Sequence, residues 1–362
     1  MFRTYRYRLY PTPRQIAVLT EILDLSRWLY NHALAYRRKR WQESRRNVTF
    51  YEQCAMWRTW RNEQPDDNRL RLINVHAGNH VLHRLEVAYR QFIKGKQGKP
   101  RFKNQRTFNS ITYEFNNGIR LKNQRLYVQN VGYMSIKWHR PLISGDIRTI
   151  ILLRNPSGWY ALLQVECLDT TPQPSTNPPL GIDVGIHHAL ALSDGTVIDS
   201  PQYFKQSLKR VRVLHRTIAR RKKGSKRREK AVHQLARAME HIANQRRDWW
   251  HRVVFNLVKE YGVIVLEDLD LRFMLHNDSL ARAAYDVSLG LFDEILDYKA
   301  FDAGVQVIKV NPRHTSQKCS QCACLVPKDL NIRIHQCPHC SFIADRDVNA
   351  ALNILALGLP SV

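Results

Sequence analysis

Acidic residues are scarce in this sequence: 31 Asp and Glu stand against 57 Lys and Arg among 362 residues. The resulting formal charge of +26 is far larger than solubility requires, and it repels itself unless a polyanion neutralises it. Phosphate backbones are the usual polyanion. The composition therefore predicts a nucleic acid as the main partner, in preference to a basic protein with a merely solvated surface.

Long apolar runs are also absent. No run reaches the length of about 18 residues that a membrane-spanning helix needs. The first six residues, Met-Phe-Arg-Thr-Tyr-Arg, contain no apolar segment of the kind found in a secretion signal. We expect a soluble, cytoplasmic protein with no membrane partner, and a hydrophobic fraction of 44% is enough to build buried cores.

Cysteine is uncommon, and four of the seven cysteines fall into two pairs. Cys319 and Cys322 form the first pair, Cys337 and Cys340 form the second, and 14 residues separate the pairs. This spacing predicts a zinc ribbon with four thiolates around one tetrahedral Zn²⁺. Four protein ligands leave no open position, which indicates a structural zinc. The remaining cysteines are Cys54, Cys167 and Cys324. The overall pattern indicates a metal site in a reducing compartment and no disulfide framework. Cys324 could compete as a zinc ligand, but its spacing favours a bystander.

The first half of the chain separates into strand-like and helix-like parts. Residues 2–10 alternate basic and aromatic side chains, which predicts a strand with one phosphate-facing side. Helical spacing runs from 11 to 95, with a cationic face over 37–46 and a second long helix over about 76–94. From 108 to 167 the period changes to two, which predicts a small antiparallel β-barrel. Its strands are expected at 110–115, 126–129, 135–138, 148–153 and 159–165.

A Pro-rich segment, 169–179, marks the clearest domain boundary, because it is too stiff and polar to pack. A chain of this length is expected to form two to four units. After the boundary, 205–250 predicts an antiparallel helical hairpin with a net charge of +13. Further strands are expected at 180–185, 189–192, 263–267 and 305–310, with a helix over 289–301.

Three carboxylates occupy positions where a solvated surface residue is not expected. Asp183 lies within an apolar strand, Glu267 ends another, and Asp347 begins the final helix. Brought together, three such groups would repel one another strongly and could ionise together only around metal. The order strand-Asp, strand-Glu, helix-Asp is typical of an RNase H-type fold, in which two Mg²⁺ ions about 4 Å apart promote phosphodiester cleavage. Asp345 is the alternative for the third position.

With these motifs in place, the sequence resembles the TnpB family of transposon-encoded, RNA-guided DNA endonucleases, which is related to type V CRISPR effectors. The resemblance rests first on three acidic motifs similar to the RuvC motifs of that family, at 181–185, 265–269 and 345–353. Further matches are at 30–31, 100–103, 242–246 and 315–322. The sequence departs from the family where glycines often end the two ribbon knuckles, since Ala323 and Ser341 stand there. A knuckle turn prefers glycine but tolerates small residues.

The resemblance implies a multidomain α+β protein with a helical recognition lobe, a wedge β-barrel and an RNase H-like RuvC nuclease domain that carries an inserted four-Cys zinc ribbon. The implied domains are a wedge barrel at 1–10 and 96–171, a helical recognition domain at 11–95, a RuvC domain at 172–314 and 343–362 with the basic hairpin 205–250, and the zinc ribbon at 315–342.

The same resemblance implies the site and the partners. Asp183, Glu267 and Asp347 would form the catalytic triad and bind two Mg²⁺ ions. One chain would bind a guide RNA from the transposon's right end, and double-stranded target DNA would be read by base pairing next to a short adjacent motif. The location would be the cytosol of a prokaryote, at the nucleoid. Expected nucleic-acid contacts are Tyr51, Asn79, His80, Arg101, Lys103, Lys222, Lys223 and Arg346, with 110–112 added for the adjacent motif; Arg346 could instead brace the carboxylates.

Three other functions are open at this point. A guided DNA-binding repressor without nuclease activity would show damaged carboxylates, and all three are intact. A DDE-type transposase would share the RNase H carboxylates and join strands without a guide, but it does not explain the family match across both halves of the chain. A basic structural protein of the ribosomal type leaves the acidic motifs unexplained.

Overall fold

The computed structural model describes residues 2–62, 69–167, 172–269, 278–329 and 332–359. The chain divides into two compact units, residues 1–169 and 170–362. The boundary falls at the start of the predicted Pro-rich segment, although 169–171 lie outside the described residues. Within the described parts, no helix is long and apolar enough to cross a membrane.

Helices follow the first strand in the first unit, as predicted for 11–95. The first of them begins at Thr12, whose hydroxyl accepts the backbone N–H of Gln15 while the Gln15 side chain accepts the Thr12 N–H. This capping box, with Pro13 in the first turn, fixes the helix start. The helical elements are α1 (Pro13–Ser44), α2 (Phe50–Asn62), the 3₁₀-helix η1 (Arg69–Leu72) and α3 (Val75–Ile93).

Close packing between α2 and α3 depends on one glycine. Trp57 of α2 is fully buried and donates its indole N–H to the Val75 carbonyl oxygen. Gly78 of α3 lies against this ring, and a Cβ at that position would be 2.3 Å from the indole nitrogen. The helices can therefore approach this closely only because Gly78 has no side chain.

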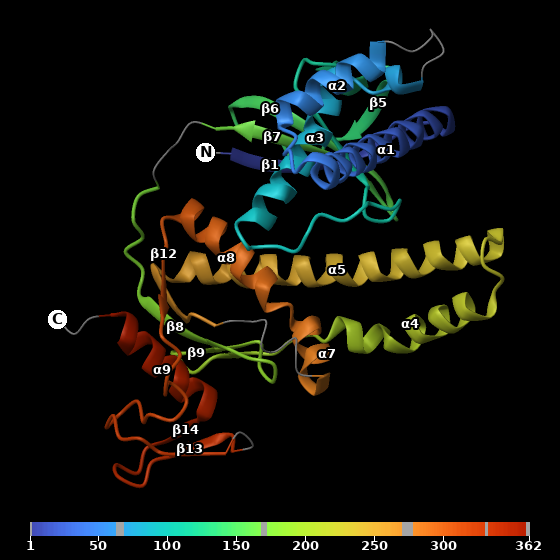
Figure 1. Ribbon diagram of the computed structural model, residues 1–362. Helices are drawn as coiled ribbons and strands as arrows, with labels where there is room; N and C mark the ends of the chain where they lie inside the picture. Colours follow the sequence, from blue (N-terminus) through green and yellow to red (C-terminus); the bar gives the residue numbers. More distant parts are fainter. Residues whose placement is uncertain (1, 63–68, 168–171, 270–277, 330–331, 360–362) are drawn as a thin grey trace. The chain divides into compact units, whose positions relative to one another are not determined.

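A seven-stranded antiparallel sheet completes the first unit (Figure 1). The two edge strands, β2 and β3, are joined by the short turn 115–118, so the sheet has to curl until its edges approach. The inner face of the sheet and the helices share one core, which includes Tyr7, Trp57 and Leu82. The strands, in the order β2-β6-β7-β1-β5-β4-β3, are β1 (Phe2–Tyr10), β2 (Ser110–Glu114), β3 (Ile119–Lys122), β4 (Arg125–Val128), β5 (Gly132–Lys137), β6 (Asp146–Asn155) and β7 (Gly158–Glu166).

All five strands predicted between 108 and 167 are present, but sequence analysis missed β3. β3 is only four residues long, and the sequences beside it, Asn-Asn-Gly at 116–118 and Lys-Asn-Gln at 122–124, are both typical of turns. In the structure, Asn123 and Gln124 both have positive φ, 49° and 57°, and form the tight hairpin turn from β3 to β4. Two residues of this conformation match the twist of antiparallel strands.

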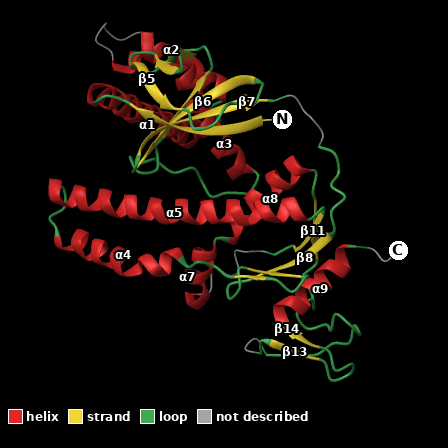
Figure 2. Cartoon of the chain, turned by 180° about the vertical axis from the view of Figure 1, so that it is seen from behind, coloured by secondary structure: helices red, strands yellow, loops and turns green. Residues whose placement is uncertain are grey.

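The second unit contains a five-stranded mixed sheet in the order β10-β9-β8-β11-β12 (Figure 2). β8 pairs antiparallel with β9 but parallel with β11, which in turn pairs parallel with β12. The strands are β8 (Pro179–Val184), β9 (Leu190–Leu192), β10 (Val197–Ile198), β11 (Val263–Glu267) and β12 (Gln306–Val310). The remaining elements are α4 (Tyr203–Arg220), α5 (Lys226–Glu260), α7 (Asp278–Val287), α8 (Leu289–Ala303), β13 (Ile334–Gln336), β14 (Ile343–Asp345) and α9 (Arg346–Gly358).

The two faces of this sheet are covered by different helices. Ile182 of β8 and Leu266 of β11 point into a core with Trp250 of α5 and Phe292 of α8. The opposite face carries α9, since a Cβ on Gly181 would lie 2.2 Å from the carbonyl oxygen of Ala351. Gly181 is therefore required for this close approach of helix and strand.

The basic hairpin is longer than predicted. It was expected over 205–250, but α5 continues to Glu260 because Val254 and Leu257 extend its buried stripe. Arg246, from one of the family-like matches, is buried and donates to the Tyr285 carbonyl oxygen at 2.5 Å and the Ser288 hydroxyl at 2.9 Å. This cation joins α5 to the junction of α7 and α8.

Candidate active site and metal centre

Two of the predicted carboxylates project from neighbouring parallel strands. The register pairs Ile182 of β8 with Leu266 of β11, so the next residues, Asp183 and Glu267, are neighbours at the carboxyl ends of their strands. Side chains alternate along a strand, so Asp183 shares a face with Gly181, the residue in contact with α9. Both carboxylates therefore lie on the α9 side of the sheet.

Asp347, at the start of α9, completes the group. It begins the helix one turn before Ala351, which touches Gly181, and it is 9% exposed. The pKa of Asp183 is raised well above its ordinary value, first by burial and then by the charges of Glu267 and Asp347. Glu267 and Asp347 are therefore close enough to Asp183 for their charges to raise its pKa.

The same helix start distinguishes the two candidates for the third carboxylate. Asp345 is the N-cap of α9, and its carboxylate accepts the backbone N–H groups of Asp347 at 2.8 Å and Val348 at 3.2 Å. Capping uses one carboxylate oxygen of Asp345, Oδ1. Asp347 instead accepts Nε of Arg346 at 2.9 Å, and a guanidinium nitrogen of Arg333 lies 3.7 Å from its second oxygen.

Arg346 was expected to contact nucleic acid or to brace the carboxylates, and its guanidinium is turned toward the carboxylates. Besides Nε, a second nitrogen lies 2.8 Å from Asp347 Oδ1, and a third donates to the Ile332 carbonyl oxygen at 3.4 Å. Arg346 also lowers the pKa of Asp183, against the larger effects of burial and neighbouring acids. Its position therefore favours the bracing role.

Glu267 is held by a residue outside the predicted triad. The Thr315 hydroxyl donates a short hydrogen bond to Glu267 Oε1, and it also lies 3.1 Å from the Pro312 carbonyl oxygen. Burial raises the pKa of Glu267, and the Thr315 hydroxyl opposes that shift. Thr315 is itself buried, at the start of the segment that leads to the first cysteine pair.

The four predicted cysteines converge on one point. Their sulfur atoms all lie within 4.8 Å of one another, with 3.6 Å between Cys319 and Cys340 and 3.5 Å between Cys322 and Cys337. Zn–S bonds of about 2.3 Å in a tetrahedron place sulfurs about 3.8 Å apart, so the donor set fits Zn²⁺. Burial opposes ionisation of Cys337, but the backbone N–H groups of His339 and Cys340 and the thiols of Cys322 and Cys340 together outweigh it and lower the pKa to about 6.

Cys324 takes no part in this cluster of sulfurs. Its backbone carbonyl accepts the N–H of Cys319 at 2.9 Å, so its role here is in the turn. The two knuckle positions without glycine have left-handed backbones, with φ of 64° at Ala323 and 61° at Ser341. A residue with a Cβ is strained in this region, by roughly 1–2 kcal/mol.

Two asparagines fasten the cysteine-rich segment to α9. Asn353 donates to the carbonyl oxygens of Thr315 at 2.8 Å and Lys318 at 2.7 Å. Asn349, one turn earlier, also donates to Lys318 and accepts the N–H of Ser320 at 3.0 Å. Sequence analysis missed these roles, although polar residues on the apolar stripe of a helix are a signal of buried hydrogen bonds.

In the first unit, the structure brings together several residues expected to contact nucleic acid. Arg84 of α3 donates to the Ser110 carbonyl oxygen at 2.8 Å and the Thr112 hydroxyl at 3.0 Å, which fixes β2 beside α3. His80 Nε2 lies 3.6 Å from Glu114 of β2. Asn79 is one residue earlier on α3, and its Oδ1 is buried without a hydrogen-bond partner among the described residues. Tyr51, on α2, is 81% exposed.

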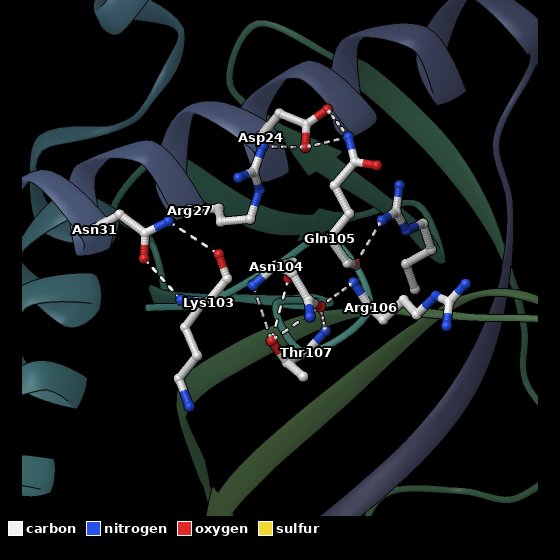
Figure 3. A network of polar contacts seen from close by, with 9 residues as sticks. Asp24, Arg27, Asn31, Lys103, Asn104, Gln105, Arg106 and Thr107 are labelled. Carbon is white, nitrogen blue, oxygen red and sulfur yellow. Dashed lines mark hydrogen bonds and ion pairs between the residues drawn. The ribbon is translucent and has the colours of Figure 1, made fainter. Parts of the chain in front are cut away.

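The basic loop after α3 is fixed against α1, as Figure 3 shows. Asn31 of α1 donates to the Lys103 carbonyl oxygen at 2.9 Å and accepts the Lys103 N–H at 2.8 Å. Two separate family-like matches, 30–31 and 100–103, are thus bonded directly to each other. Arg101 is exposed on this loop, and Lys222 and Lys223 are exposed at the turn between α4 and α5.

Comparison with known proteins identifies the class. Family models match three parts of the chain: "Helix-turn-helix domain" (HTH_OrfB_IS605) over 1–46, "Probable transposase" (OrfB_IS605) over 162–278, and "Cas12f1-like, TNB domain" over 290–354. The first of these segments folds as β1 and the single helix α1.

The similarity to curated relatives extends over the whole chain. A "Putative RNA-guided DNA endonuclease" of Streptomyces pristinaespiralis is 32% identical over 99% of this chain and 89% of its own length. "Putative RNA-guided DNA endonuclease InsQ" of Escherichia coli (strain K12) is 26% identical over 98% and 92%. "CRISPR-associated endodeoxyribonuclease Cas12f1" of Sulfoacidibacillus thermotolerans is 27% identical over 54% and 49%. The chain belongs to the TnpB family.

Proposed function

We propose that this chain is the RNA-guided DNA endonuclease of an insertion-sequence transposon, which hydrolyses phosphodiester bonds of guide-matched DNA beside a short adjacent motif. The observation that supports the proposal is the position of Asp183 beside Glu267 on the neighbouring strand, with Asp347 close enough to act on its pKa, in a chain similar from end to end to proteins named RNA-guided DNA endonucleases. A guided repressor would not need this set of acids.

In this proposal, the three carboxylates hold two Mg²⁺ ions. The raised pKa values of Asp183 and Glu267, and the repulsion of Asp183 by its acidic neighbours, fit a hard, oxygen-seeking cation, because bound cations would relieve this repulsion. When bound, such a pair activates water and stabilises the leaving oxygen of a phosphodiester. The four cysteines would hold a structural Zn²⁺.

The surrounding residues would keep the carboxylates in place. Arg346 and Arg333 hold Asp347, Thr315 holds Glu267, and the Asp345 cap fixes the start of α9. Holding ligands through a second layer of hydrogen bonds keeps catalytic geometry within narrow limits.

The domain assignments follow the same proposal. The first unit would provide the wedge barrel (1–10 and 96–171) and the recognition helices (11–95), and the second would provide the RuvC domain with its ribbon. Tyr51, Asn79 and His80, with 110–112, would read the adjacent motif. Backbone contacts to RNA and DNA would come from basic residues, including the exposed Arg101, Lys222 and Lys223 and the half-buried Lys103. One chain would bind one RNA from the transposon's right end.

Sequencing the RNA that co-purifies tests this proposal. The chain would be expressed together with its flanking element DNA, and purified in parallel with and without RNase. We expect one RNA class that ends in sequence from the element's border, and loss of target choice after RNase. Co-purification of cellular RNA at random, with unchanged DNA selection after RNase, would favour a DDE-type transposase.

A further inference from the structure

A cavity of about 670 Å³ in the first unit is not used by the site described above. It lies between the second half of α1 and the end of α3, and its walls include Trp41 of α1, Tyr89 and Phe92 of α3, and Lys99 beyond α3. Its volume falls in the range of roughly 300–1,000 Å³ that is typical of small-ligand sites. A duplex cannot enter a space of this size, but one extruded nucleotide can.

The apolar walls of this cavity are open to solvent. Trp41 is 50% exposed and Ile93, which also lines the cavity, is 72% exposed. Large apolar side chains gathered at an open surface commonly mark a binding site. The rings of Trp41, Tyr89 and Phe92 provide flat faces, on which bases of any identity can stack.

The charged residues that line the cavity are all basic among those described. Two of them, Arg37 and Arg46, are paired with Glu86 and Glu52, whereas Arg38 and Lys99 touch no carboxylate in the part of the chain that the structure describes. Arg38 instead donates to the Pro100 carbonyl oxygen at 2.6 Å and lies over the Phe102 ring, so these contacts hold it toward the loop after α3. Arg45 lies over the Trp41 ring at 5.9 Å. These cations would attract a phosphate beside a stacked base.

The cavity also offers polar groups that can recognise a base edge. Gln42 and Asn47 line it, and each carries both a donor and an acceptor. Arg37, by contrast, is buried and bonded to Gln53 at 2.8 Å and Glu86 at 2.5 Å, so it supports the wall rather than the ligand. Stacking faces, cations and amides together are the features that recognise unpaired bases in single-stranded RNA.

We propose that this cavity binds an unpaired nucleotide of the guide RNA, with the base on Trp41 and its phosphate at Arg38 and Lys99. The inference rests on the proposed RNA-guided function, and it adds a place where an RNA loop or junction is anchored. RNA is the occupant because its loops present splayed bases permanently, whereas target DNA is read by pairing.

The test measures binding of a fluorescein-labelled oligouridylate to the full chain by anisotropy. Salt at about 0.5 M screens the general attraction of a chain with charge +26, so that stacking contributes a larger share of the signal. The variants are Trp41→Ala, Trp41→Phe, and Trp28→Ala as the control. Trp28 is a second exposed tryptophan of α1, 42% exposed, and does not line the cavity.

We expect Trp41→Ala to weaken binding by about tenfold, the loss typical of one stacked base. Trp41→Phe and Trp28→Ala should bind within about twofold of the parent. A guide RNA with 4-thiouridine at unpaired positions should crosslink to the peptide that contains Trp41. Unchanged affinity in Trp41→Ala, or an equal loss in Trp28→Ala, would overturn the proposal.

Two further arms separate the alternatives. If Trp41→Ala weakens binding of an oligothymidylate but not of the oligouridylate, the occupant is DNA and the RNA assignment is wrong. Binding is measured with all three carboxylates intact and without cleavage. Failure of guided cleavage would therefore count against the proposed function alone. The comparison of Trp41 variants tests whether the cavity binds a nucleotide.

Discussion

Replacing Thr315 by valine tests how the cysteine-rich segment supports the carboxylates. Valine has nearly the same shape, so the buried site keeps its packing, but the hydroxyl that donates to Glu267 is lost. A hydrogen bond to a charged group contributes roughly 1.5–3 kcal/mol. At about 1.36 kcal/mol per tenfold in rate, Thr315→Val should slow DNA cleavage by about 10- to 150-fold.

The acid side of the pH–rate profile should move as well. The Thr315 hydroxyl lowers the pKa of Glu267 against the effect of burial, so its removal raises that pKa. Glu267 then ionises at higher pH, and the rate of Thr315→Val should rise with pH later than the rate of the parent.

Single-turnover cleavage of a matched target at several pH values measures both effects. Thr315→Ser keeps the hydroxyl and is the matched control, which should recover most of the rate and the parent profile. Zinc content, measured on each variant, shows whether the cysteine cluster is still formed. A Thr315→Val rate and pH profile equal to those of the parent, with zinc retained, would refute the positioning role.

Three other changes follow from the same contacts. Asp183→Asn should raise the melting temperature in EDTA by a few degrees. The pKa of Asp183 is higher in the folded state, so the ionised carboxylate destabilises the fold, and this stability is lost as pH rises from the unfolded pKa toward the folded one. A lower melting temperature of the variant in EDTA at neutral pH would contradict this. Ala323→Gly should relieve left-handed strain and slow zinc loss to a chelator, with a net gain of about 0.5–1 kcal/mol after the added flexibility of glycine; faster loss would show that the turn is not strained. Gly181→Ala should push α9 away by contact with Ala351, destabilise the fold by about 1–3 kcal/mol and abolish cleavage, whereas Gly98→Ala, in open space, should change neither.

Much of the fold could be predicted because the signals are local. Alternating apolar residues identified β7, an unbroken apolar run identified β11, and the cysteine spacing identified the sulfur cluster. Asp183 could be recognised because an acid within an apolar strand has to be compensated. The four residues of β3 were missed, since their local signal is weaker than the turns on both sides.

The supporting contacts could not be predicted, because they join segments far apart in the chain. Thr315 meets Glu267 across 48 residues, and Asn353 meets the carbonyl oxygen of Thr315 across 38. Nothing local in the sequence shows which residues these side chains contact, and only folding brings them together. The cavity at Trp41 could not be predicted from the sequence for the same reason, since its walls come from α1, α3 and the loop after α3.

Plasmid cleavage with a matched guide tests the central claim most directly. The chain, expressed with its element RNA, would be given plasmids that differ only in the guide-matched sequence, with Mg²⁺ or with EDTA, beside Asp183→Ala. We predict cutting of the matched plasmid alone, in Mg²⁺ alone, and none by the variant. Cutting that ignores the guide sequence, or that persists in Asp183→Ala, would contradict the account.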